Sequence, residues 1–161
     1  MQLTTRPAIP EDKDFFFHLY VGTREQELAA FGWNDQQKQA FLQMQFNAQQ
    51  RWYETAYPQA EWRIVTLEGK PVGRTIVDRG EAGATLVDIA LIPETRGAGL
   101  GTRLMQELLE RCHAEAIPMR LQVLKTNPAQ RLYQRLGFRT VGEDQLYLQM
   151  EWRPSDIKPG N

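Results

Sequence analysis

Three alternating glycines stand between a long apolar run, Thr85–Ile92, and an amphipathic segment that begins near residue 100. Such glycines let the backbone adopt positive φ and come close to a ligand, because no Cβ intrudes. A helix beginning directly after them would offer unpaired N–H groups and its positive dipole end. The order therefore predicts a strand, a tight turn and a helix around a site for an anion such as pyrophosphate. The turn consists of Arg96, Gly97, Ala98, Gly99, Leu100, Gly101 and Thr102.

The glycine spacing separates this turn from two other phosphate-binding loops. A dinucleotide-binding turn follows G-x-G-x-x-G, whereas the third glycine here, Gly101, comes one residue too early. The chain also has no G-x-x-x-x-G-K-S/T motif, so hydrolysis of nucleoside triphosphates has no support. Arg96 and the strand-ending Pro93 favour a ligand site, but a tight turn could also use glycines for its shape alone.

Charge and cysteine content exclude several classes of function. The 161 residues include 19 Lys and Arg against 20 Asp and Glu, and a net charge of -1 gives no electrostatic case for binding nucleic acid or a membrane surface. Cys112 is the single cysteine, so an intrachain disulfide and a multi-cysteine zinc site are excluded, and we expect no metal. We find neither a secretory-type start nor a run near the roughly 20 apolar residues of a membrane span, so we expect a cytoplasmic protein.

Hydrophobic periodicity and turn residues predict one α/β domain over residues 1–153, with a frayed tail at 154–161. In the second helix a stripe with helical spacing is predicted to face the core, and it consists of Phe41, Met44, Ala48 and Trp52. Strands are expected at Leu3–Ala8, Trp62–Leu67, Val72–Val77, Thr85–Ile92, Met119–Leu124, Phe138–Val141 and Leu146–Trp152. Helices are expected from Pro10 to about Ala30, from Asn34 or Asp35 to Tyr57, from Gly99 to Ala116 and from Asn127 to about Leu136.

A second block of sequence makes the glycine turn specific. It runs Asn127-Pro128-Ala129-Gln130-Arg131-Leu132-Tyr133-Gln134-Arg135-Leu136-Gly137-Phe138. Together the two blocks resemble the acyl-CoA motifs of the GCN5-related N-acetyltransferase (GNAT) superfamily, R/Q-x-x-G-x-G/A followed by Asn, Ala, Tyr and Gly-Phe around a short helix. Residues 85–140 match closely, and the first sixty match in outline. The resemblance implies a twisted mixed sheet of about six to seven strands with helices on both faces, in the order strand, two helices, three strands, helix, strand, helix, two strands.

The resemblance also implies acetyl-CoA as the cosubstrate. In this family the strand before the glycine turn splays from the next strand, and the pantetheine arm bonds to the exposed backbone as an extra strand would. The positions that match this strand are Ile89, Ala90 and Leu91. Amides from Gly97 through Thr102 would hold the pyrophosphate. Asn127 would bond the pantetheine arm, although an Asn before Pro at a helix start is also a simple N-cap.

Two residues match catalytic positions of the family. Tyr133 matches the general acid that protonates the departing thiolate, and its reference pKa of about 10 lies close to that of a thiol at about 8.5. Asp88 is the one acid in the apolar strand and is our candidate for the base that deprotonates an amine, with burial raising its pKa. An outward-facing or salt-bridged aspartate is the alternative. Other members carry a glutamate five residues before the asparagine, but this chain has Gln122 there, which cannot accept a proton.

The resemblance implies transfer of an acetyl group to a primary amine of a small molecule or protein, by direct attack in a ternary complex. A non-catalytic acyl-CoA-binding sensor or interaction module is the alternative, and the resemblance leaves a homodimer open. The segment between the first two strands usually forms one wall of the acceptor site. Its residues that could reach an acceptor are Arg24, Glu25, Trp33, Gln45, Trp52 and Tyr53.

Overall fold

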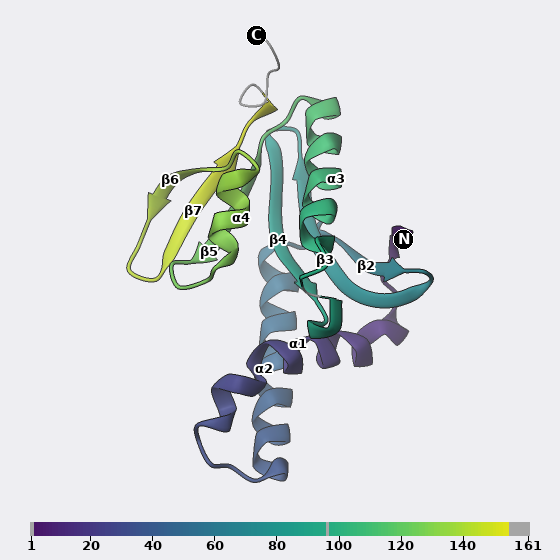
Figure 1. The fold of residues 1–161 in the computed structure, drawn as a ribbon, viewed down its shortest axis with the longest axis vertical. Helices are drawn as coiled ribbons and strands as arrows, with labels where there is room; N and C mark the ends of the chain where they lie inside the picture. Colours follow the sequence, from purple (N-terminus) through teal and green to yellow (C-terminus); the bar gives the residue numbers. More distant parts are fainter. Residues whose placement is uncertain (1, 96, 155–161) are drawn as a thin grey trace. The chain divides into compact units, whose positions relative to one another are not determined.

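The computed structural model describes residues 2–95 and 97–154, and it contains the expected strands and helices in the expected order (Figure 1). Arg96 and the tail from residue 155 lie outside the described residues. The strands are β1 Leu3–Pro7, β2 Glu61–Leu67, β3 Lys70–Gly80, β4 Gly83–Leu91, β5 Met119–Leu124, β6 Arg139–Glu143 and β7 Tyr147–Trp152. The helices are η1 Pro10–Asp12, α1 Lys13–Ala29, α2 Asp35–Ala56, η2 Pro93–Thr95, α3 Leu100–Glu115 and α4 Ala129–Arg135.

The strands form one mixed sheet in the order β1-β2-β3-β4-β5-β7-β6. β1 and β2 are antiparallel, and β7 pairs antiparallel with both β5 and β6. β4 and β5 are parallel, and their pairing ends at Leu86↔Leu121 although Val87 and Asp88 continue β4. The pairing of β4 with β5 in the second unit therefore covers only the first part of β4. The α/β mixed fold expected from the sequence is confirmed.

The chain forms two compact units, each with its own core. Of the described residues, the first comprises 2–75 and 89–95, and the second comprises 76–88 and 97–154. α1, α2, β1 and β2 belong to the first unit, whereas α3, α4, β5, β6 and β7 belong to the second. β3 and β4 each contribute residues to both units.

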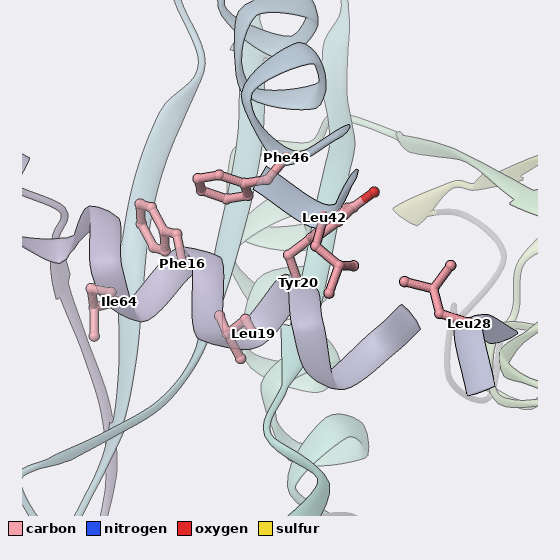
Figure 2. Close-up of a cluster of buried hydrophobic side chains, with 7 residues drawn as sticks. All are labelled: Phe16, Leu19, Tyr20, Leu28, Leu42, Phe46 and Ile64. Atoms are coloured by element: carbon pink, nitrogen blue, oxygen red, sulfur yellow. The ribbon is translucent and has the colours of Figure 1, made fainter. Parts of the chain in front are cut away.

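Aromatic and aliphatic side chains from α1, α2 and β2 form the core of the first unit (Figure 2). Phe46 of α2 is fully buried, with its ring 5.4 Å from that of Phe17 and 5.8 Å from that of Tyr20. These distances are typical of favourable aromatic pairs. The buried members of the cluster are Phe16, Leu19, Tyr20, Leu28, Leu42, Phe46 and Ile64.

The prediction of which face of the second helix is buried was wrong. α2 buries Leu42 and Phe46, whereas Met44 is 58% and Trp52 59% exposed. Ala48 is also exposed, and Phe41 is half-buried. α2 carries apolar residues on more than one face, so its periodicity alone did not determine which face contacts α1.

The core of the second unit gathers around α3, which buries Leu104, Met105, Leu109 and Cys112. Trp152 of β7 is fully buried in this unit. The other buried apolar residues of the unit are Ile76, Val77, Ala84, Leu86, Leu100, Met119, Leu121, Val123, Tyr133, Phe138 and Met150. Leu100, the first residue of α3, is one of these buried residues, so packing holds the N-terminal end of the helix in place.

A close approach of two strands explains Gly73 in β3. A Cβ built on Gly73 would lie 2.7 Å from Leu91 Cδ2 and closer still to the carbonyl oxygen of Ala90. The Ile92 N–H donates to the Val72 carbonyl at 2.8 Å, so the end of β4 is bound to the start of β3. Only glycine fits between these backbones.

Asp12 fixes the passage from β1 into α1. The Arg6 guanidinium donates two hydrogen bonds of 2.9 Å to its carboxylate, and the Ile9 N–H donates a third of 2.8 Å. Hydrogen bonding from Arg6 holds the pKa of Asp12 below its usual range, although burial opposes the shift. This stabilisation is complete above the unfolded-state pKa of about 3.9 and is lost as pH falls through the lower folded-state pKa.

We therefore expect Asp12→Asn to lower the free energy of unfolding at pH 7 by about 1 to 3 kcal/mol, because two charged hydrogen bonds are lost. Urea unfolding followed by circular dichroism measures this difference, which should shrink as pH falls below about 4. Asp14→Asn is the matched control, since Asp14 is an exposed acid in the first turn of α1. Equal destabilisation by both variants would contradict the role given to Asp12.

Candidate functional site

The glycine turn leads directly into an uncapped helix. Gly97 and Gly99 have φ of 83° and 77°, and Gly99 is the N-cap of α3. No side chain caps α3, and the first turn closes with a 3.1 Å hydrogen bond from the Arg103 N–H to the Gly99 carbonyl. The amides of Leu100, Gly101 and Thr102 therefore lie at the open end of the helix.

The space beside these glycines is open. A Cβ built on Gly97 or Gly99 would meet no heavy atom of the described residues within 4 Å. Packing therefore does not require glycine at either position, whereas the positive φ does. Open space, uncapped amides and the positive end of a 16-residue helix together fit an anionic group such as pyrophosphate.

The predicted pantetheine positions lie at the end of β4, in the first unit. Ile89, Ala90 and Leu91 are half-buried, and Ala90 packs against the core cluster of that unit. Ala90 and Leu91 are the residues that a side chain at position 73 would strike. Close contact with β3 therefore fixes the backbone position of this end of β4.

Asn127 lies on the surface just before α4. Its Oδ1 accepts a hydrogen bond of 2.9 Å from the Ala129 N–H, which is an Asx turn rather than a full N-cap, because the N-cap residue is Pro128. Asn127 therefore has a local structural role at the start of α4, which is the alternative that the sequence left open. With Oδ1 engaged, the side-chain NH₂ is the group that Asn127 can offer to a carbonyl oxygen.

Tyr133 and Asp88 interact electrostatically within the second unit. Tyr133 on α4 is 7% exposed, and its ring lies 5.7 Å from that of Phe138. Burial, with a smaller contribution from the negative charge of Asp88, raises the pKa of Tyr133 to about 12. The phenol is therefore a weaker acid than its reference value indicated and stays protonated at neutral pH. Asp88 is half-buried in β4.

The predicted acceptor residues all lie in the first unit and are spread along α1, α2 and their connection. Arg24 is exposed and lies 5.3 Å from the centre of the Tyr20 ring. Trp33 stacks on Phe31 at 5.2 Å, and the Trp52 ring contacts that of Tyr53 at 5.8 Å. Glu25 is exposed and Gln45 is half-buried. None of these six residues lines the cavity that the first unit contains.

Sequence reasoning missed a cavity of about 680 Å³ in the first unit. Its residues come from the connection between β1 and α1, from both helices and from β2, and they are Ala8, Ile9, Pro10, Lys13, Phe16, Asn47, Gln50, Arg51, Glu54 and Trp62. Arg74 of β3 does not line the cavity, but it contacts a residue that does. It is 4% exposed and donates to Gln50 Oε1 at 2.9 Å. A single arginine within the apolar strand Val72–Val77 was the signal that could have pointed here.

Comparison with known proteins agrees with the motifs. A family profile described as an acetyltransferase (GNAT) domain matches residues 28–152. The crystal structure of PaiA N-acetyltransferase from Thermoplasma acidophilum in complex with coenzyme A has a TM-score of 0.71 and 16% identity, covering 95% of this chain and 99% of that one. The ribosomal-protein-S18-alanine N-acetyltransferase from Escherichia coli has a TM-score of 0.66 and 19% identity, covering 99% of both chains. These similarities show a shared fold.

A search of curated proteins found no sequence match. Within residues 2–95 and 97–154 no group of three or more His, Cys, Asp or Glu could hold a metal ion. In the same part of the chain, none of the helices combines the length and the apolar character that crossing a membrane requires.

Proposed function

The chain belongs to the GNAT acetyltransferase family, and from that premise we propose that it transfers an acetyl group from acetyl-CoA to a primary amine of a small molecule or protein. We propose direct attack in a ternary complex, within one acetyltransferase domain over residues 1–153. The observation that carries the donor is the uncapped start of α3 beside open space at Gly97 and Gly99. Because such a turn provides amides without a side-chain acceptor, it favours an anionic group such as pyrophosphate over a neutral or cationic one.

The donor-binding residues divide by the group they would hold. The amides from Gly97 through Thr102 would donate to the pyrophosphate, with Arg96 adding positive charge. The backbone of Ile89, Ala90 and Leu91 would bond the pantetheine arm, as a neighbouring strand does. The Asn127 NH₂ would donate to a carbonyl of the same arm. When bound, acetyl-CoA supplies an acyl group activated as a thioester.

Tyr133 and Asp88 would move the protons. Tyr133 stays protonated at neutral pH, since its pKa is raised to about 12, and it would donate to the sulfur as the thiolate departs. Asp88 would accept a proton from the substrate ammonium, directly or through water, so that the neutral amine can attack the thioester. An alkylamine with a pKa of about 10 is about one part in a thousand neutral at pH 7, so such a base is needed.

The test is acetyl-CoA consumption with a panel of amines, with calorimetry of coenzyme A binding alongside. We expect binding of coenzyme A, and release of its thiol with at least one class of acceptor, whether small amines or peptides with a free N-terminus. Binding without thiol release for any acceptor would favour the non-catalytic sensor instead. No heat with millimolar coenzyme A would contradict the donor site itself.

A further inference from the structure

The residues proposed for acetyl transfer do not line the cavity of the first unit. It opens between the end of β1, the start of α1, the C-terminal half of α2 and the start of β2. Its volume of about 680 Å³ lies in the range of small-molecule sites. All its lining residues belong to the first unit, so the shape and charge of the cavity do not depend on the second unit.

One wall of the cavity is aromatic and held in place from behind. The rings of Phe16 and Trp62 lie 5.9 Å apart, and Phe16 is 5% exposed. The Arg74 guanidinium lies 5.0 Å from the Phe16 ring centre and 5.5 Å from that of Trp62. Such cation–π contacts in a buried setting fix the two rings. The two ring planes are tilted by 47° to each other, so the wall is a preformed, angled aromatic surface.

The polar groups of the cavity offer donors rather than acceptors. Gln50 Oε1 accepts from Arg74, and because a guanidinium can only donate, the Gln50 amide is oriented with its NH₂ elsewhere. Asn47 Oδ1 accepts from Gln43 Nε2 at 3.1 Å, which likewise leaves its NH₂. Two side-chain oxygens are thus engaged, and two NH₂ groups remain for a ligand.

The rim adds positive charge. Lys13 and Arg51 are exposed, and among the described residues neither makes a hydrogen bond or an ion pair. Glu54 is the one acid in the lining. Two cations and two amide donors against one carboxylate favour an anion, and the aromatic wall favours a ligand with an apolar body.

We propose that this cavity binds a small carboxylate carrying an apolar or aromatic group. The carboxylate lies toward Lys13 and Arg51, and the apolar body lies on Phe16 and Trp62. This proposal does not depend on acetyl transfer, because binding is measured without acetyl-CoA.

Three matched probes test the charge preference on the intact, ¹⁵N-labelled chain. 3-Phenylpropanoate, its neutral amide and 3-phenylpropylamine share one body and differ in charge. Titrations followed by NMR report on the Trp62 indole N–H and on the side-chain NH₂ signals of Asn47 and Gln50. We expect the carboxylate to shift these signals and to bind at least about threefold more tightly than the amide, and the amine to bind least. Amine binding as tight as carboxylate binding, or no shift at Trp62 with any probe, would overturn the proposal.

Charge variants then locate the anion. Lys13→Ala and Arg51→Ala should each weaken 3-phenylpropanoate binding about three- to tenfold, whereas Glu54→Gln should strengthen it. Lys70→Ala is the matched control, because Lys70 is an exposed cation of the same unit that does not line the cavity. All four side chains are exposed, so the variants should fold, and melting temperatures check this. Loss of affinity in Lys70→Ala equal to that in the two rim variants would also refute the proposal.

Discussion

Tyr133→Phe should lower kcat by about 100-fold or more, because the departing thiolate loses its proton donor. The substitution removes one hydroxyl from a buried ring and keeps the contact with Phe138, so the fold and the affinity for coenzyme A should remain. The rate of thiol release at saturating substrates measures kcat, and calorimetry measures the affinity. Since the pKa of Tyr133 is about 12, its ionisation should cause no decline of kcat between about pH 7 and pH 10.

Tyr57→Phe is the control for this variant, because Tyr57 lies at the end of α2 and is outside the proposed site. It should retain the full kcat. An unchanged kcat in Tyr133→Phe would remove Tyr133 from the acid role. A decline of kcat in the wild type that follows a group with a pKa near 9 would have to be assigned to another residue or to the acceptor amine.

Gly99→Ala should raise the dissociation constant for coenzyme A by about 10- to 100-fold. The methyl group would occupy the open space beside the uncapped α3, and losing one charged hydrogen bond to a phosphate costs about 1.5 to 3 kcal/mol. The positive φ of 77° also strains any residue with a Cβ. Calorimetry with coenzyme A measures the affinity, and thermal unfolding measures the strain.

Gly69→Ala separates these two effects. Gly69 has φ of 81° and likewise no heavy atom within 4 Å of a built Cβ, but it lies in the β2–β3 turn. Both variants should lose similar stability, and only Gly99→Ala should lose affinity for coenzyme A. Equal affinities in the two variants would show that strain, rather than contact with the ligand, accounts for the glycine at position 99.

The second half of the chain could be predicted well because its determinants are local. Gly97 and Gly99 mark a turn that no other residue type forms easily, and both have the expected positive φ. Pro93 and Gly137 end the elements before them, as expected from their chemistry. The family motifs add the assignment of Tyr133, which spacing alone would not have provided.

The first half was harder because its determinants are tertiary. α2 carries apolar residues on several faces, and only contact with α1 decides that Leu42 and Phe46 are buried while Met44 and Trp52 are not. The cavity wall depends on Arg74, which is distant in sequence from Phe16 and from α2. The raised pKa of Tyr133 also arises from burial, which no local pattern encodes.

The absence of a side chain at position 73 has a consequence for evolution as well as for geometry. Any replacement of Gly73 must displace the backbone at Ala90, because the new Cβ would lie too close to the Ala90 carbonyl oxygen. The position of the backbone at Ala90 therefore depends on Gly73, about seventeen residues earlier in the sequence. Gly73 contributes no functional group of its own. Laboratory selection for new acceptors should accordingly vary exposed helix positions and leave this one position untouched.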